Sequence, residues 1–264
     1  MEAFGYIGAL AMGLLLGLIG GGGSILTVPI LVYLFGVEPV LATACSLFIV
    51  GSTAAVGSAS HVRLGNVHWP TAVLFGGPSI LAVYATRAWV LPALPEVWMT
   101  VGSLVITKPV GLLVLFALLM IAAAWTMIRP TRTIVETKGE RHHYLALLDG
   151  AVVGTLTGLV GAGGGFLIIP ALVVLARLPM KQAVGTSLVV IAAKSLCGFL
   201  GDLQNGTTFH WSFLLTFVGV AVVGTLLGSR LHQKTSDAWL KKAFGYTVLL
   251  MGLWIMAHEL WLKY

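Results

Sequence analysis

The sequence predicts an all-α membrane protein with two inverted-topology repeats, each a broken, re-entrant helical hairpin followed by three transmembrane helices. Three observations predict this fold: the composition, an internal repeat and the placement of Lys and Arg. Of the 264 residues, 58% are hydrophobic and only 9% are charged, whereas about a quarter of the residues in soluble domains carry charge. A transmembrane helix needs about 20 apolar residues, and runs of that length fill most of this chain.

The composition also argues against other classes of protein. The net charge of +6 could indicate a nucleic-acid partner, but the cations lie beside apolar spans and form no basic face with interleaved aromatic residues. Cys45 and Cys197 lie inside apolar segments, so we expect no disulfide framework. We expect no cofactor and no metal site. No Lys or Arg precedes Arg63, so the first apolar segment lacks the basic start of a signal peptide and should stay in the mature protein.

An internal repeat divides the chain into two halves. Residues 17–29 read GLIGGGGSILTVP and residues 158–170 read GLVGAGGGFLIIP, an offset of 141 residues. Further identities at this offset, or one residue beyond it, are Ala42 and Ala183, Ser46–Leu47 and Ser187–Leu188, Gly57 and Gly198, Gly65 and Gly206, and His68–Trp69 and His210–Trp211. Chance does not hold a register this long. We therefore expect a first membrane repeat at 1–128, a cytoplasmic linker at 129–144 and a second membrane repeat at 145–264.

Each half contains the same series of apolar segments. A segment interrupted by glycines comes first, and three spans of transmembrane length follow it. The interrupted segments are 3–35 and 145–177, and the predicted spans are 40–60, 70–90 and 109–128 in the first half and 182–200, 211–229 and 239–262 in the second.

The distribution of cations indicates that each interrupted segment returns to the side on which it starts. Lys and Arg in short loops favour the cytoplasmic side. Two returning segments place the cations of the linker and of the 230–242 loop together inside, and leave Arg87, Lys108 and Lys263 outside. A returning hairpin with three full spans crosses the membrane an odd number of times, so the second half is inverted relative to the first. Both termini are then outside a cell inner (plasma) membrane.

The glycine runs at 20–23 and 161–165 are the first candidates for a functional site. Each glycine inside a helix costs about 1 kcal/mol relative to alanine, and irregular backbone at membrane depth is tolerated only inside the protein or along a cavity. The stretches that follow, 24–35 and 165–177, could form half-helices of about 18 Å. Such half-helices direct free N–H groups at the cavity and favour an anion, so we expect the two tips to meet near the midplane.

The candidate substrate-binding residues are these glycines, nearby hydroxyl residues and one lysine. They are Gly20, Gly21, Gly22, Gly23, Ser24, Thr43, Ser46, Gly161, Gly163, Gly164, Gly165, Thr186, Ser187 and Lys194. Ser24 could cap the first half-helix or bind the ligand, and Pro29 and Pro170 should bend their half-helices. Two plainer interpretations stay open: the glycines could serve close helix packing, and the hydroxyls could bond the preceding turn.

Three ionisable residues need separate interpretation. Lys194 lies well inside a span, where charge is costly and indicates function. It could bind the negative charge of the substrate or pair with Asp202 two turns later. His61 and Asp202 occupy equivalent positions at the ends of their spans, where they could carry protons in a coupled cycle or simply lie at the interface.

With these motifs the chain resembles the TauE/SafE sulfite exporter family. The resemblance covers nearly the whole chain. It rests on the duplicated glycine run, on the proline six residues after its last matched glycine (Gly23 to Pro29, Gly164 to Pro170), and on the following Ala-x-x-x-Ser-Leu in both halves. It implies transport of sulfite, sulfoacetate or other small sulfur-containing or carboxylate anions, driven in many members by an ion gradient.

We therefore expect a secondary transporter and not an enzyme. The anion would bind near the bilayer midplane between the glycine tips, and access would alternate between the two sides, coupled to H+ or Na+. No GxxxxGK[ST] run is present, so no ATP site is visible. Besides the anion and the coupling ion, the expected partner is the lipid bilayer, with a homodimer left open and no nucleic acid.

Two other functions remain as alternatives. An anion channel is the first, because paired re-entrant hairpins can also line a pore. An intramembrane serine hydrolase would use Ser24 with His61 or His68 as base. This second alternative is less favoured, because the second half has Gly165 in the place of Ser24.

Overall fold

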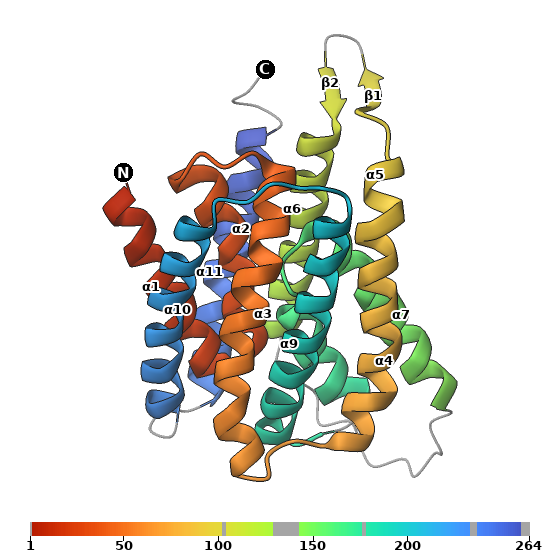
Figure 1. The fold of residues 1–264 in the computed structure, drawn as a ribbon. Helices are drawn as coiled ribbons and strands as arrows, with labels where there is room; N and C mark the ends of the chain where they lie inside the picture. Colours follow the sequence, from red (N-terminus) through yellow and green to blue (C-terminus); the bar gives the residue numbers. More distant parts are fainter. Residues whose placement is uncertain (1, 102–103, 129–142, 176–177, 233–236, 260–264) are drawn as a thin grey trace.

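A computed structural model describes residues 2–101, 104–128, 143–175, 178–232 and 237–259, and nearly all of these residues are helical (Figure 1). Within them, five helices are long and apolar enough to cross a membrane. They are Pro39–Arg63, Trp69–Ala93, Lys108–Trp125, Lys181–Gln204 and Trp211–Leu231. Shorter apolar helices cover Phe4–Ile19, Gly21–Leu34, Ala146–Val160 and Gly245–Ala257. The prediction of a helical, multi-pass membrane protein is confirmed.

The first half begins with an interrupted helix. Its elements are α1 (Glu2–Ile19), the 3-10 helix η1 (Gly21–Leu26), α2 (Thr27–Pro29) and the π-helix η2 (Ile30–Leu34). The spans that follow are α3 (Pro39–Arg63), then α4 (Trp69–Ala85), which continues through the π-helix η3 (Thr86–Val90) into α5 (Leu91–Ala93), and α6 (Lys108–Ile128). These helices agree with the predicted spans to within a few residues at most ends.

The second half repeats this order. Its elements are α7 (His143–Val160), α8 (Gly165–Pro170), the π-helix η4 (Ala171–Leu175), α9 (Met180–Gln204), α10 (Trp211–His232) and α11 (Asp237–Ala257). Residues 129–142 of the predicted linker and the last residues of the predicted span 239–262 lie outside the described part of the chain.

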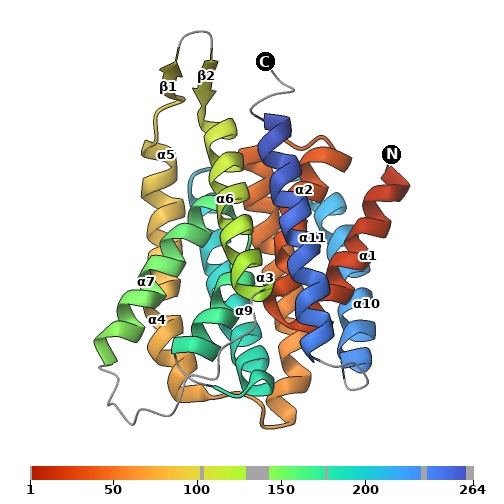
Figure 2. The same cartoon turned by 180° about the vertical axis from the view of Figure 1, so that it is seen from behind.

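Both interrupted helices return towards the end from which they started (Figures 1 and 2). Helix α1 runs inward from the end that carries the N-terminus, and η1, α2 and η2 lead back to the start of α3 at that same end. Helix α7 runs inward from the opposite end, and α8 and η4 lead back towards the start of α9. Both chain termini lie at one end of the molecule.

The two halves are packed into each other rather than side by side. Helix α1 packs along α10, α7 packs along α4, α3 packs along α9, and α6 packs along α11. Small residues permit the closest of these approaches: a Cβ on Gly13 of α1 would collide with the carbonyl of Ala221 on α10, and a Cβ on Gly154 of α7 would collide with Ser79 on α4. Backbone contact of this kind stabilises helix pairs in a bilayer, where burial of apolar surface contributes little.

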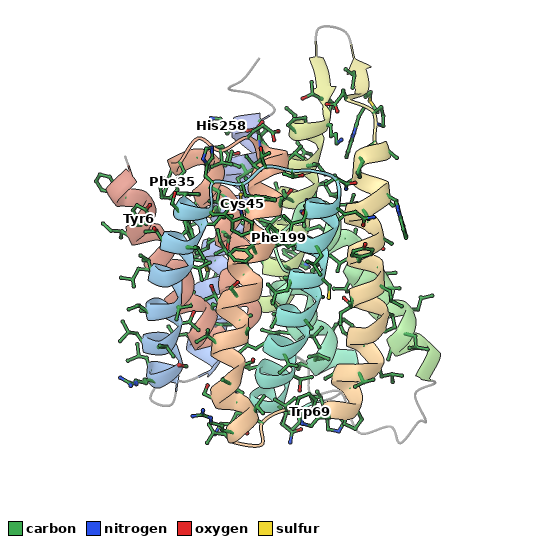
Figure 3. The ribbon with its side chains drawn as sticks, in the orientation of Figure 1. Tyr6, Phe35, Cys45, Trp69, Phe199 and His258 are labelled. Carbon is green, nitrogen blue, oxygen red and sulfur yellow. The ribbon has the colours of Figure 1, made fainter. Side chains whose placement is uncertain are left out.

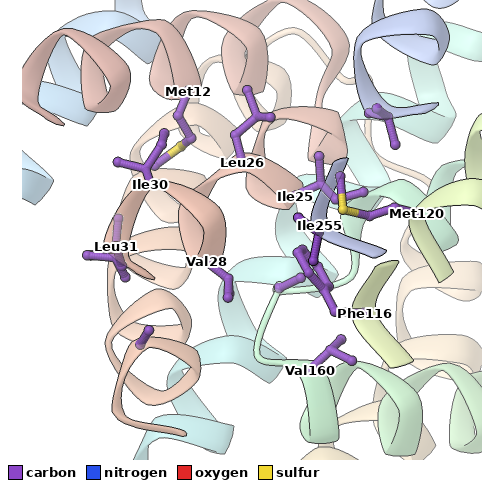
Figure 4. Close-up of a cluster of buried hydrophobic side chains, with 14 of the residues drawn as sticks. Met12, Ile25, Leu26, Val28, Ile30, Leu31, Phe116, Met120, Val160 and Ile255 are labelled. Atoms are coloured by element: carbon purple, nitrogen blue, oxygen red, sulfur yellow. The ribbon is translucent and has the colours of Figure 1, made fainter. Parts of the chain in front are cut away.

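The first returning hairpin is held in an apolar core. Met12 of α1, Ile25 of η1 and Val28 of α2 pack with Phe116 of α6 and Ile255 of α11, and all five side chains are buried (Figure 4). The hairpin is therefore surrounded by protein, as irregular backbone at membrane depth requires.

One element was not expected from the sequence. Strands β1 (Val97–Val101) and β2 (Leu104–Thr107) form an antiparallel hairpin between α5 and α6, and this hairpin projects beyond the helices at the end that carries the termini (Figure 1). The rest of the described chain is mainly helical and agrees with the predicted all-α membrane protein, so this hairpin is a local addition to that fold. Most residues of the two strands are β-branched or aromatic, which suits paired strands, but such a short run between two long apolar spans resembles any other loop.

Candidate functional site

The two glycine runs meet in the interior of the protein. A Cβ on Gly21 would collide with the Cα of Gly165, and a Cβ on Gly165 would collide with the backbone of Gly21. Two backbones approach this closely only where neither residue has a side chain. We call residues 20–23 and 161–165 together the glycine junction.

The helices break differently in the two runs. In the first, Gly20 alone has a positive φ, of 80°, and residues 21–23 already belong to the 3-10 helix. In the second, Gly161, Gly163 and Gly164 all have φ between 63° and 69°, and α8 starts at Gly165. Positive φ is readily adopted only by glycine, so the second run forms a longer turn than the first.

Equivalent contacts join each glycine run to the other half of the chain. A Cβ on Gly20 would lie 2.8 Å from Val184 at the start of α9, and a Cβ on Gly161 would collide with Thr43 at the start of α3. Gly161 follows Gly20, and Val184 follows Thr43, by the 141 residues of the sequence repeat. Each tip is therefore seated on the first turns of the long helix of the opposite half.

The predicted half-helices are not regular α-helices. Each contains a short helix that ends at its proline, Pro29 or Pro170, and a π-helix follows directly in both cases. A proline has no N–H to donate to the carbonyl four residues before it, so the ladder of hydrogen bonds widens there instead of only bending.

The prediction that Ser24 caps the first half-helix is wrong. Ser24 lies inside the 3-10 helix, Gly20 is the N-cap residue, and the Ser24 hydroxyl donates to the carbonyl oxygen of Gly21 at 2.7 Å. A short 3-10 turn places this hydroxyl over the carbonyl three residues earlier, where it satisfies an acceptor locally.

Lys194 reaches the glycine junction from α9. Its side chain is 1% exposed, its Nζ donates to Thr157 Oγ1 on α7 at 2.8 Å, and a Cβ on Gly164 would lie 2.7 Å from that Nζ. Asp202 forms its ion pair with Arg87 instead, so the alternative of a Lys194–Asp202 pair is wrong. Two turns separate the two residues by about 12 Å along the helix, and their side chains find different partners.

The other candidate hydroxyls, on α3 and α9, are of three kinds. Those of Thr43 and Ser187 donate to backbone carbonyls three residues earlier, at 2.6 Å and 2.8 Å, and Thr186 Oγ1 accepts the N–H of His68 at 2.9 Å. The plainer interpretation of helix-bonded hydroxyls therefore describes Thr43 and Ser187. The Ser46 hydroxyl is buried and has no hydrogen-bond partner among the described residues.

Two further polar residues at the junction were missed by the sequence analysis. Thr157 holds Lys194, and the buried hydroxyl of Ser195 has no partner within the described ranges and lies beside Gly163. The repeat could not reveal them, because their equivalents 141 residues earlier are the apolar Leu16 and Ala54.

His61 and Asp202 lie far from each other, near opposite ends of the antiparallel helices α3 and α9. His61 is 6% exposed and lies beside Gly185 at the start of α9. Asp202 Oδ1 is 3.3 Å from Nη1 of Arg87, whose side chain is completely buried. The sequence analysis placed Arg87 only on the outer side, because its place at the end of an apolar span does not reveal that α9 supplies a carboxylate partner.

Comparison with known proteins decides the family. The family described as sulfite exporter TauE/SafE matches residues 6–255. This chain belongs to that family. Together with the five candidate membrane spans, membership makes this TauE/SafE protein a multi-pass membrane transporter.

Curated relatives of this TauE/SafE protein match it over most of their length. A probable membrane transporter protein of Xylella fastidiosa (strain Temecula1) is 30% identical, over 93% of this chain and 91% of its own. Proteins with the same description from Methanocaldococcus jannaschii and Bacillus subtilis are 27% and 26% identical, over 93% and 89% of this chain and 91% and 90% of their own. No solved structure matches significantly.

Proposed function

We propose that this TauE/SafE protein is a secondary transporter of a small sulfur-containing or carboxylate anion, of the sulfite, sulfoacetate and organosulfonate class. The anion binds near the bilayer midplane at the glycine junction. One observation carries this proposal: the ammonium group of Lys194 is buried beside Gly164, with the neutral Thr157 hydroxyl as its hydrogen-bond acceptor.

The charge balance at the junction favours an anionic ligand. A buried ammonium is costly unless a negative charge compensates it, and among the described residues no carboxylate forms an ion pair with Lys194. The hydroxyls of Ser46 and Ser195 are buried with no bond partner in the described part of the chain, so they are available as donors. An oxyanion between these groups would satisfy the ammonium and both hydroxyls.

We also propose that the two halves are inverted repeats and that access alternates as one half moves against the other. Support comes from the repeat-related contacts of Gly20 with Val184 and of Gly161 with Thr43, and from the opposite directions in which the two interrupted helices enter. Such an arrangement places one binding site at the crossing of the repeats. Movement of either tip away from the other half would open that site to one side only.

The proposed orientation follows from the described cations. Arg63 ends α3, Lys181 begins α9, and Arg230 lies in the last turn of α10, all at the end of the molecule opposite to the termini. Because short cytoplasmic loops carry the excess of Lys and Arg, we assign this end to the cytoplasm and both termini to the outside of the inner membrane. The coupling ion is H+ or Na+, and His61 and Asp202 are the proposed proton carriers.

Uptake by purified protein in proteoliposomes tests the transport proposal. Radiolabelled sulfite, thiosulfate, sulfoacetate, taurine and simple carboxylates are supplied with and without an imposed H+ or Na+ gradient. A secondary transporter gives saturable uptake of at least one of these anions that a gradient stimulates and an ionophore abolishes. Flux that neither saturates nor responds to any gradient would identify a channel, and absence of flux for the whole panel would contradict the proposal.

A further inference from the structure

Arg87 and Asp202 form a buried ion pair that uses only part of its bonding capacity. The pair is made through one contact of 3.3 Å, between Nη1 and Oδ1. Nε and Nη2 of Arg87 and Oδ2 of Asp202 are buried and have no hydrogen-bond partner among the residues the structure describes. A guanidinium normally presents parallel donors to both oxygens of an oxyanion, so this site could hold more acceptors than Asp202 supplies.

The pair joins the two halves of the protein at the end that carries the termini. Arg87 lies in the π-helix that continues α4, and Asp202 lies near the end of α9. A Cβ on Gly201 would be 2.9 Å from the Cβ of Arg87, and Asn205 Nδ2 donates to the Arg87 carbonyl oxygen at 3.0 Å. The backbone and Cβ of Arg87 are therefore held against α9 whether or not the carboxylate contact of its guanidinium persists.

Helix α3, which packs along α9, passes near this site. Cys45, which is 4% exposed, lies close enough to Arg87 and Asp202 to interact electrostatically with both. Figure 3 shows Cys45 on the side of the molecule nearer the termini, opposite to Trp69. The same helix contributes Thr43 and Val50 to the surroundings of the glycine junction, so Cys45 lies between two residues of α3 that reach the junction.

We propose that the Arg87–Asp202 pair is a second anion-binding site and a gate between the glycine junction and the outer end of the protein. As the pair parts, a carboxylate or sulfonate oxygen of the ligand replaces Asp202 on the guanidinium. This inference rests on the proposed anion transport for the identity of the ligand. An unpaired donor in a buried site is costly, and an oxyanion bound through two oxygens would satisfy the nitrogens that Asp202 leaves without partners.

The gate is tested with Cys45 as a native reporter, in a Cys197→Ser background. An impermeant methanethiosulfonate reagent is added from outside to proteoliposomes of known orientation. Asp202→Asn removes the attraction that closes the pair, so Cys45 should be modified about tenfold faster than in the parent, as expected for a shift towards the open population. If Asp202→Asn folds and Cys45 is modified no faster, the gate is contradicted.

The double variant Arg87→Gln/Asp202→Asn covers the case in which the single variant does not fold. It leaves no unpaired buried charge, and neutral replacement of a buried pair is often tolerated. Fast modification of Cys45 supports the gate, and modification at the parent rate by a folded double variant contradicts it. A Cys45→Ser protein, which should not be modified, shows that the signal comes from this residue.

The anion contact is tested by protection of Cys45. Sulfoacetate is the probe, because it carries both a carboxylate and a sulfonate and, unlike sulfite, does not attack thiol reagents. It should slow the modification of Cys45 in Asp202→Asn, which keeps Arg87, and not in the double variant, with chloride as the control anion. Binding at Arg87 is contradicted if sulfoacetate protects Cys45 equally in the two variants, or if it gives no protection in Asp202→Asn. Labelling of Cys45 does not require transport. A negative labelling result therefore contradicts the gate alone, whereas absence of uptake contradicts the proposed transport function.

Discussion

Lys194 and Arg87 are both buried cations, but they differ in whether a negative charge lies beside them. Arg87 has the carboxylate of Asp202 at 3.3 Å, whereas the described partner of Lys194 is the hydroxyl of Thr157. A hydroxyl can accept the ammonium hydrogen bond but cannot neutralise its charge. Lys194, at the glycine junction, is thus the cation whose charge no described carboxylate neutralises. This is the physical reason to place the main anion site at the junction and only a second site at Arg87.

We expect Lys194→Met to weaken anion binding while the protein stays folded. Hydrogen bonds that involve a charged group contribute about 1.5–3 kcal/mol, so the affinity should fall by roughly 10- to 100-fold. Calorimetric titration with the best anion of the uptake panel measures the effect. Lys242→Met, which removes an exposed cation of α11, is the matched control and should bind as the parent does. Equal affinities in the two variants would restrict Lys194 to a structural role.

The interrupted helices are the elements that bring the two halves into contact. A regular helix would have carried α1 and α7 straight on, whereas the positive φ of Gly20 and of Gly161 reverses the chain and delivers Gly21 to Gly165. The proline of each returning arm then widens its last turns into a π-helix. Such turns are often found at functional sites, and here both belong to the arms proposed to move.

Gly21→Ala should disrupt the junction through steric collision alone. Gly21 has no positive φ, so the added methyl group acts only through its collisions with Gly165 and with the side chain of Ile191, and overpacking of this kind costs about 1–3 kcal/mol. We expect a lower unfolding temperature and loss of anion uptake. Gly77→Ala on α4 is the control, because nothing lies within 4 Å of a Cβ at that position. If uptake by Gly21→Ala equals that of Gly77→Ala, close apposition of the tips is not needed for transport.

At the scale of the whole molecule, most of the described cations at helix ends lie at one end of the molecule, and the termini lie at the other. Arg63 and Lys181 lie at the first end, and Lys108 at the start of α6 lies at the second, where Glu96 is 3.7 Å away. Because Glu96 is exposed, this outer ion pair is screened by solvent and contributes little. The charge asymmetry behind the proposed orientation thus resides in the cations at the end opposite to the termini.

The orientation can be measured by labelling single cysteines in a Cys45→Ser/Cys197→Ser background. Arg63→Cys and Lys242→Cys should react with an impermeant maleimide only from the cytoplasmic side, and Glu96→Cys only from the outside, because all three positions are exposed in the structure. If Arg63→Cys and Lys242→Cys react from opposite sides, the returning hairpin of the second half is excluded.

The sequence by itself determined the membrane class, the family, the duplication and nearly every helix. These properties depend on local composition and on identities at a fixed offset, such as the glycine runs and the prolines that follow them. It also pointed to Lys194, because a cation deep in an apolar span is conspicuous without any knowledge of its neighbours.

Only the tertiary structure decided which polar groups meet. Arg87 and Asp202 are 115 residues apart, and Thr157 and Lys194 are 37 apart on different helices. Such pairs depend on the rotation and depth of each helix relative to the others, and nothing in the local pattern of apolar residues records either quantity. For the same reason the sequence left open whether Asp202 pairs with Lys194, and it gave no sign that Arg87 is completely buried with Asp202 as its partner.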